Sequence, residues 1–360
     1  MSSESYVIKF DHNLGRFFRS ALFRTHVNPA VTFFLTGTAL AQRRAAVRRA
    51  AWARQGVQVP PLMIVSITNR CNLQCKGCYA HVLHPTSEDE MSDARLLELT
   101  READELGISI LMIAGGEPLL RPVFFGLAER YPHVLFPVFT NGLLINDEKL
   151  ARFKKLRNLV PILSLEGQRS ETDLRRGNGV YACVKEKMKL LNQAGILFGT
   201  SLTLTRQNFD LITTPEFQTE LSNLGSQVSI FVDYVPVQPG TENLTLTAVQ
   251  KGREAAWMKS LRERVPGLFI SLPGDEEVYG GCLAGGRGFI HVNPSGHLEP
   301  CPFAPFSDAD LAQISLKEAL GSDFLRVIRE NANRMKESQG GCTLWENREW
   351  VLAQMKELKA

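Results

Sequence analysis

The sequence has no apolar run long enough to cross a lipid bilayer. Its longest apolar stretch near the N-terminus, residues 29–41, is shorter than the roughly 20 residues that a spanning helix needs, and no short hydrophobic region with a cleavage site opens the chain. It also has no internal repeat and no low-complexity segment, and its 22% of charged residues is ordinary, which excludes the disordered and fibrous classes. We therefore expect an unexported, cytoplasmic protein.

We expect no export signal, yet the chain contains cysteines. The chain has seven cysteines, and in a reducing compartment such residues favour thiolates, metals and redox chemistry over a disulfide framework. Six of them fall into two groups. The seventh, Cys183, lies in a helical pattern and is predicted to be a buried structural thiol.

Positive and negative charges nearly balance over the whole chain, but they are unevenly placed. The net charge is +3, whereas residues 1–61 carry nine Lys or Arg against two acids. The part after Pro29 is predicted to be a basic amphipathic helix. Three roles fit this segment: peripheral contact with an anionic membrane and delivery of a lipid, binding of a leader peptide or acidic partner, or packing on the rest of the chain. Nucleic acid is not an expected partner, because stacking aromatics do not alternate with the arginines.

From residue 62 onward, short β-rich runs alternate with longer amphipathic helical patterns. Near-continuous apolar strands with capped helices between them predict a parallel sheet, and right-handed crossovers curl it toward a barrel. The fold class is therefore α/β, a partial (β/α)6 TIM-like barrel, with its chemistry at the C-terminal strand ends. The expected strands are 62–67, 109–114, 135–140, 161–166, 198–205 and 228–237.

The last third of the chain has a different texture. A helix is expected over 247–265, a hairpin over 288–301 and a further helix over 315–335, followed by a final Gly-Gly-Cys. We expect three parts: the basic helical segment 1–61, the barrel 62–240, and a linker helix with a small appended domain over 241–360.

The loop after the first strand carries Cys71, Cys75 and Cys78. Three thiols on one loop can hold three irons of a cubane and leave the fourth iron open, whereas a structural zinc site uses four ligands. The spacing favours an iron–sulfur cluster, with zinc as the alternative.

The second strand ends in Gly115, Gly116 and Glu117. Glycines let a ligand approach the backbone, and a carboxylate can meet an ammonium group. Together the two motifs resemble the radical S-adenosylmethionine (SAM) superfamily, whose members carry Cys-x3-Cys-x2-Cys after the first barrel strand and Gly-Gly-Glu-Pro after the second. The resemblance covers roughly residues 62–240.

This resemblance implies an enzyme. Cys71, Cys75 and Cys78 would hold a [4Fe-4S] cluster whose open iron is chelated by SAM, with Gly115, Gly116 and Glu117 at the methionine amino end. One electron from a donor such as a flavodoxin or ferredoxin would split SAM and give a 5′-deoxyadenosyl radical, which takes hydrogen from an organic substrate.

Other positions match the superfamily less closely. Thr140 and Asn141, at the third strand end, are expected to contact the cofactor. Ser164 is a candidate for the SAM ribose and Arg176 for its carboxylate, although a plain strand-end hydroxyl and a solvated arginine explain them as well.

Two departures from the superfamily pattern stand out. Gly77 occupies a usually aromatic position before the third cysteine, so that Tyr79, on its other side, becomes the candidate for cofactor contact. Glu166 precedes Gly167 where relatives often have Ser-x-Asp-Gly. Glu166 is therefore a candidate catalytic acid or a local structural residue.

The tail resembles the SPASM extension in its shortened Twitch form, because Gly296 and Cys301 follow Cys282 in the expected order and Cys342 comes later. The resemblance implies a second, auxiliary iron–sulfur cluster on Cys282, Cys301 and Cys342. A zinc site using His291 or His297 is the alternative, although hairpin histidines are more often exposed than ligating.

The substrate class stays open at this point. Relatives with such an extension modify peptides and protein side chains, and others act on cofactor precursors or lipids. A zinc-binding interaction protein without enzymatic activity is the alternative of a different class.

Overall fold

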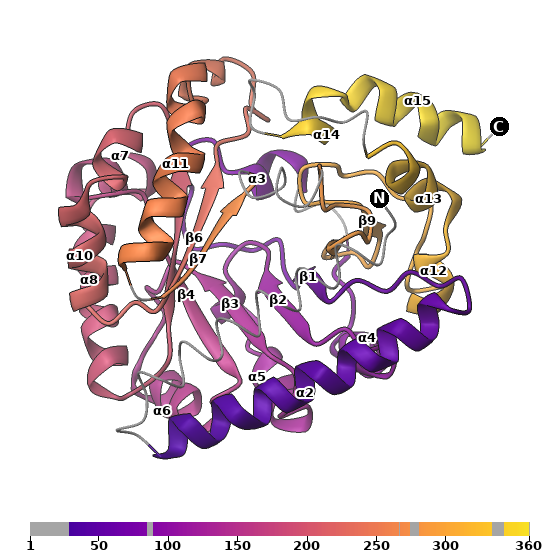
Figure 1. Cartoon of the computed structure of the whole chain (residues 1–360), viewed down its shortest axis with the longest axis horizontal. Coiled ribbons are helices and arrows are strands. Elements are labelled where there is room, and N and C mark those ends of the chain that lie inside the picture. The colour runs from indigo at the N-terminus through magenta and orange to yellow at the C-terminus, as the bar shows by residue number, and fades with distance from the viewer. Residues whose placement is uncertain (1–28, 85–88, 266, 274–280, 333–341, 360) are drawn as a thin grey trace.

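In the part of the chain that the structure describes, nine strands form one curled sheet, an open half-barrel with helices on its outer face (Figure 1). The computed structural model describes residues 29–84, 89–265, 267–273, 281–332 and 342–359. Within them the strand order is β7-β6-β5-β4-β3-β2-β1-β8-β9, and all neighbouring pairs except β8–β9 are parallel. The strands are β1 (Leu62–Ser66), β2 (Ile110–Ala114), β3 (Phe136–Thr140), β4 (Leu159–Leu165), β5 (Gly199–Leu204), β6 (Val228–Asp233), β7 (Leu268–Leu272), β8 (Phe289–Val292) and β9 (Leu298–Glu299).

All six expected strands are present as β1 to β6, in chain order and in parallel pairing. Strands that are covered on both faces of a parallel sheet are apolar along their whole length. All five residues of β2, for example, are buried. The predicted α/β class and partial barrel are confirmed.

Three further strands extend this sheet at both edges. β7 pairs with β6, and β8 pairs with β1 in the register Ile64 to His291. The tail therefore contributes to the same sheet as the barrel, because its strands cover the edges that β1 and β6 would otherwise expose. The division into parts at residues 61 and 240 stays a prediction about function.

The helices begin and end where the sequence supplies caps. The Ser92 hydroxyl accepts a hydrogen bond from the Arg95 amide in the first turn of α4, and this helix ends at the left-handed Gly107. The helices are α2 (Pro29–Ala53), α3 (Tyr79–Leu83), α4 (Asp93–Leu106), α5 (Phe124–Arg130), α6 (Asp147–Lys155), α7 (Arg169–Arg176), α8 (Val180–Gln193), α9 (Phe209–Ile212), α10 (Pro215–Asn223), α11 (Ala248–Arg264), α12 (Leu316–Leu320), α13 (Asp323–Glu330), α14 (Thr343–Glu346) and α15 (Arg348–Lys359), with short 3-10 turns at Pro118–Leu120 and Glu242–Leu244.

One helix that the sequence predicted is two helices in the structure. The sequence predicted a single helix over 315–335, but α12 ends at Gly321 and Ser322 caps the start of α13. A glycine stop directly before a serine cap ends one helix and begins another.

Side chains alternate across the strands and give the sheet two apolar layers. The larger layer lies between the strands and the outer helices, and the smaller fills the barrel interior with side chains that include Ile64, Val160 and Ile162. Strand residues two apart lie on the same face of the sheet, so Ser66 and Ser164 lie on the same interior face as Ile64 and Ile162. The C-terminal ends of β1 and β4 therefore present polar groups to the barrel interior.

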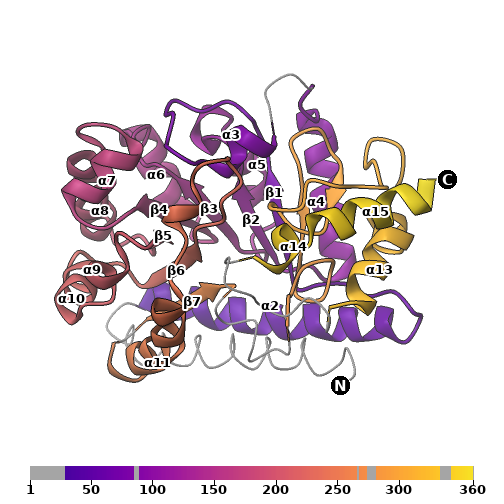
Figure 2. The same cartoon turned by 90° about the horizontal axis from the view of Figure 1, so that it is seen from above.

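The basic helix α2 packs across the barrel at the end where the strands begin (Figures 1 and 2). Gln42 Nε2 donates to the carbonyl of Ser109 at 3.3 Å, and Arg49 Nη1 donates to the carbonyl of Gly107 at 2.6 Å. Ser109 lies directly before β2, so α2 covers the barrel end opposite to the loop with the three cysteines. The predicted helix after Pro29 is thus present, and its inward face is packed.

The rest of the N-terminal prediction falls on residues 1–28, which lie outside the described residues. None of the described helices is both long and apolar enough to span a bilayer.

Candidate radical SAM site

The cysteine loop is held against the end of β2 by backbone hydrogen bonds. The Gly116 amide donates to the Thr68 carbonyl at 2.7 Å, and the Glu117 amide donates to the Arg70 carbonyl at 2.8 Å. A Cβ on Gly115 would overlap the Thr68 carbonyl, and one on Gly116 would overlap that of Arg70. The two glycines therefore bring the cysteine loop onto the second strand end.

Cys71, Cys75 and Cys78 are free, half-buried thiols on this loop. Cys78 occupies the position directly before α3, and its amide donates to the Cys75 carbonyl at 3.3 Å. Burial raises the pKa of the Cys71 and Cys75 thiols, while the Arg176 guanidinium lowers that of Cys75. A nearby cation favours the thiolate, which is the form that binds metal.

Glu117 braces the ends of β2 and β3. Its buried carboxylate accepts hydrogen bonds from the Thr140 hydroxyl at 2.7 Å and from the amides of Asn141 and Leu119 at 2.8 and 3.0 Å. Burial raises the pKa of Glu117, although these hydrogen bonds oppose the shift. The expected contact of Glu117 with the methionine amino group stays a prediction.

Asn141 ties the same strand end to the cysteine loop. Its Nδ2 donates to Asn72 Oδ1 at 2.8 Å, one residue after Cys71. Thr140 and Asn141 therefore lie beside the loop, as their strand-end positions predicted, while Asn72 is a loop residue that the sequence did not single out.

Gly77 has an unexpected aromatic neighbour in Tyr234, the residue that follows β6. A Cβ on Gly77 would overlap the Tyr234 hydroxyl, and Gly77 itself has a φ of +65°. The hydroxyl is buried and has no hydrogen-bond partner among the described residues. An aromatic ring thus lies against the loop, but it comes from the sixth strand end instead of position 77.

Glu166 pairs with two consecutive arginines at the end of α7. Its Oε1 accepts from Arg175 Nη1 at 2.6 Å and from Arg176 Nε at 2.7 Å, while Oε2 is buried without a hydrogen-bond partner among the described residues. Arg175 also donates to the Thr203 hydroxyl at 2.8 Å and to the Lys76 carbonyl at 3.2 Å. Glu166, the candidate catalytic acid, and Arg176, the candidate partner of the SAM carboxylate, therefore belong to one ion-pair cluster. This cluster contacts the cysteine loop through Arg175.

Ser164 lies on the interior register of β4, opposite Ser201 of β5. It is half-buried, two residues before Glu166. The structure thus brings Ser164 to the same strand end as Glu166, and its role toward a ribose stays a prediction.

Cys282, Cys301 and Cys342 meet in one buried cluster although 60 residues separate the first from the last. A hydrogen bond to Cys342 and burial raise the pKa of the Cys301 thiol, and Cys282 adds to the shift. The predicted grouping is thus present in space. Tyr79 packs into this cluster, with its ring 4.9 Å from that of Phe303, and burial together with Cys78 and Cys301 raises its pKa.

Each cysteine set supplies three thiols, whereas a structural zinc site uses four ligands. Three thiols can hold three irons of an iron–sulfur core and leave one iron open. The binding of a cluster by either set stays a prediction at this point.

The structure also tests the expectations for Cys183 and for the two hairpin histidines. Cys183 lies on α8 as predicted, but it is half-buried instead of buried. His291 is fully buried on β8, so the expectation of an exposed hairpin histidine is wrong for it, whereas His297 is partly exposed.

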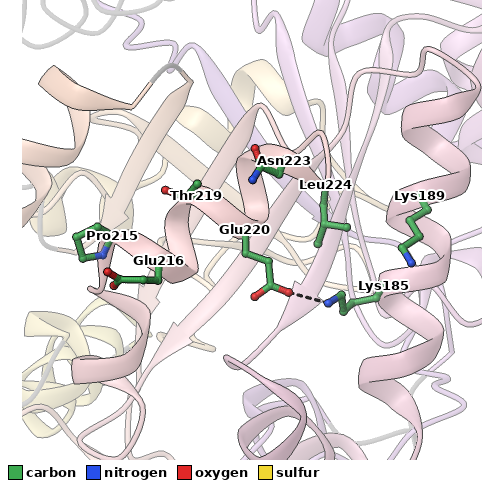
Figure 3. A pocket seen from close by; sticks show the side chains of 8 residues that line it. All are labelled: Lys185, Lys189, Pro215, Glu216, Thr219, Glu220, Asn223 and Leu224. Atoms are coloured by element: carbon green, nitrogen blue, oxygen red, sulfur yellow. Dashed lines mark hydrogen bonds and ion pairs between the residues drawn. The ribbon is translucent and has the colours of Figure 1, made fainter.

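A pocket of about 570 Å³ lies away from this site, between α8 and α10 on the outer helical layer (Figure 3). Lys185 and Glu220 pair across it at 2.6 Å. It contains none of the predicted site residues, and the strand-end loops of the barrel remain the candidate site.

The chain has recognisable relatives. Residues 65–212 match the Radical SAM superfamily. The AdoMet-dependent heme synthase of Methanosarcina barkeri is 24% identical over 317 residues, 80% of this chain and 88% of that protein. The mycofactocin maturase MftC of Mycobacterium tuberculosis is 28% identical over 269 residues, 69% of this chain and 66% of that protein.

Solved structures share the fold. Streptococcus suis SuiB bound to the precursor peptide SuiA superposes with a TM-score of 0.62 at 16% identity, covering 84% of this chain and 73% of SuiB. The matching region begins in β1, contains the cysteine loop and the Gly-Gly-Glu strand end, and extends to α9. Residues 65–212 of this chain are therefore a radical SAM domain.

Proposed function

We propose that this protein is a radical SAM enzyme that uses a [4Fe-4S] cluster on Cys71, Cys75 and Cys78. The observation that carries the proposal is the loop with three half-buried thiols, closed onto the Gly115–Gly116 strand end within a radical SAM domain. When bound, the cluster and SAM supply a 5′-deoxyadenosyl radical that removes hydrogen from the substrate.

The chain's own residues position the cofactor and exclude water. Gly115 and Gly116 leave backbone room beside the cysteine loop, and Glu117 fixes the ends of β2 and β3 through three accepted hydrogen bonds. Arg176 favours the thiolate of Cys75, and its guanidinium suits a carboxylate. Glu166 keeps one buried oxygen available for a hydrogen-bond donor of the bound molecules.

The second cysteine set holds an auxiliary iron–sulfur cluster in this proposal. Its three thiols are buried together behind Tyr79 and Phe303, where access of water and oxygen is low. Three protein ligands leave one iron for a substrate group or for a fourth ligand. Reduction of the first cluster requires an external electron donor of the flavodoxin or ferredoxin kind.

The substrate is a peptide or a cofactor precursor. Two similar proteins support these classes: the structure of SuiB holds the precursor peptide SuiA, and one relative is a heme synthase. Lipid delivery by the basic segment is less favoured, because α2 contacts the residues before β2, at the barrel end opposite to the cysteine loop.

The proposed activity is tested by anaerobic reconstitution and measurement of 5′-deoxyadenosine from SAM with a strong reductant. The change of Cys71, Cys75 and Cys78 together to alanine should abolish the product, and Cys183→Ala should leave it intact because Cys183 lies on α8 outside both sets. Product formation by the triple variant would overturn the proposal. Stimulation by a peptide fraction or by a polar small-molecule fraction distinguishes the two substrate classes.

Peripheral membrane contact would use the outward face of α2, where Val47 is 71% exposed beside Arg43 and Arg44. Vesicle flotation with anionic lipid tests it. We expect no flotation, because the inward face of α2 is already packed on the barrel. Flotation that is lost in Arg43→Glu would instead establish membrane contact by this face.

A further inference from the structure

A second group of ligating side chains lies outside both cysteine sets. His84 follows α3, His291 lies on β8 and Glu299 lies on β9, so only the fold brings them together. They are 8%, 0% and 2% exposed, and one ligating atom of each lies within 4.8 Å of the others. Two imidazoles and one carboxylate converge without a thiol.

The carboxylate lies between the two imidazoles. Glu299 Oε2 is 2.7 Å from His291 Nδ1 and 3.9 Å from His84 Nε2. A buried carboxylate is costly unless its charge is compensated, and a divalent cation placed between these three atoms compensates it. Imidazole nitrogen and carboxylate oxygen are ligands that zinc and similar divalent ions accept.

Two more polar side chains form hydrogen bonds with His291 and Glu299. His291 Nε2 is 2.8 Å from the Ser66 hydroxyl, and Asn293 Nδ2 donates to Glu299 Oε1 at 2.8 Å. Metal-bound histidines usually donate their other ring N–H to an oxygen acceptor, which fixes the ring and the tautomer. Ser66 can serve as that acceptor, and Asn293 leaves Glu299 Oε2 for the ion.

A pocket of about 490 Å³ opens onto this group. His84 and Glu299 are part of its lining, together with Asn293 and His297 of the β8–β9 turn and Lys356 of α15. The pocket gives an ion a path from solvent and leaves room for a water or an anionic ligand at a further coordination position. Sites with three protein ligands and one exchangeable position have this arrangement.

We propose that His84, His291 and Glu299 bind one divalent transition-metal ion, with zinc as the probe, and that the open coordination position faces this pocket. Without the ion, His291 Nδ1–H donates to Glu299. On binding, the imidazole stays neutral, its proton moves to Nε2 and is donated to Ser66, and Nδ1 coordinates the ion. The site is separate from the six cysteines and independent of the proposed radical chemistry.

Metal analysis of the full chain tests the proposal. The protein is loaded with its iron–sulfur clusters first, so that the cysteines are occupied, and is then equilibrated with zinc or cobalt(II) and desalted. We expect one zinc per chain, and a cobalt spectrum with ligand-field bands but without thiolate-to-cobalt charge transfer. A protein without stoichiometric zinc, or with the thiolate band, would overturn the assignment.

The variant His84→Ala should weaken zinc binding at least about tenfold. His297→Ala is the matched control, because His297 lines the same pocket but is outside the three ligands, and its zinc binding should be unchanged. Equal zinc binding by the wild-type chain and His84→Ala would show that Ser66, His291 and Glu299 form only a structural hydrogen-bond network.

Folding of the variants is checked by their thermal unfolding in chelator. If His84→Ala does not fold, the wild-type chain is tested alone. Zinc that binds the native state raises its Tm, and the rise grows as the free zinc concentration increases above the Kd. A Tm that is the same in zinc and in chelator would then count against the site.

Discussion

At the scale of single residues, the cysteine loop depends on a glycine that the superfamily pattern did not lead us to expect. Gly77 has a positive φ and lies against the Tyr234 hydroxyl, so both backbone conformation and space exclude a side chain. The aromatic group expected at position 77 is supplied by the end of the sixth strand. One departure in the sequence is thus matched by a residue 157 positions away.

We predict that Gly77→Ala lowers the free energy of unfolding by about 1–3 kcal/mol and reduces the iron retained per chain. Urea unfolding and iron analysis measure the two effects. Gly179→Ala is the control, because Gly179 has a φ of +83° but no atom within 4 Å of an added Cβ, and it should cost only about 1 kcal/mol.

Removal of the Tyr234 hydroxyl should recover part of the stability that Gly77→Ala loses. In a double-mutant cycle, Gly77→Ala costs less in the Tyr234→Phe background, since the overlapping oxygen is gone. Equal costs in both backgrounds would show that the overlap is relieved by movement of the loop.

At the scale of elements, α2 shows why a basic segment need not mark a binding surface. Its arginines divide between two faces: Arg49 is 2% exposed and donates to the Gly107 carbonyl at 2.6 Å, whereas Arg44 is exposed. On the inward face, Arg49 therefore supplies a hydrogen-bond donor to a backbone carbonyl of the turn before β2. Net charge alone could not distinguish these two positions.

We expect Arg49→Ala to lower the free energy of unfolding by about 2 kcal/mol, because the Gly107 carbonyl loses a charged donor. Arg44→Ala should change it by less than about 0.5 kcal/mol. Chemical denaturation of the two variants makes the comparison, and equal effects would show that Arg49 contributes nothing specific to the attachment of α2.

At the scale of the whole molecule, the sheet crosses the expected boundary at residue 240. β7 covers β6 and β8 covers β1, so the tail closes both edges of the half-barrel. In the β8–β9 hairpin, Glu299 pairs with His291 beside β1, and Cys301 follows two residues later. The chain therefore folds across the boundary that we expected at residue 240.

A fragment of residues 1–240 should not fold as a stable unit. Loss of β7 and β8 exposes two strand edges and part of the interior apolar layer. We expect dye binding and a broad, non-cooperative thermal transition by circular dichroism. A sharp transition close to that of the full chain would contradict this expectation and support an independently folded barrel.

The sequence by itself determined the six central strands, the helix caps and the cysteine loop with Cys71, Cys75 and Cys78. These features depend on neighbours in the chain: the period of apolar residues, a capping side chain, or three thiols within eight positions. Strand ends of a parallel sheet share one edge, so the positions of Gly115, Thr140 and Ser164 near the cysteine loop also followed from the order of the strands.

Only the tertiary structure decided which distant residues meet. Tyr234 fills the space beside Gly77, Glu166 pairs with Arg175 and Arg176, and His84 joins His291 and Glu299. A lone histidine or tyrosine has no local pattern, because its role depends on neighbours supplied by other strands. The curling of the sheet, and the addition of β8 beside β1, brought these groups within reach of one another.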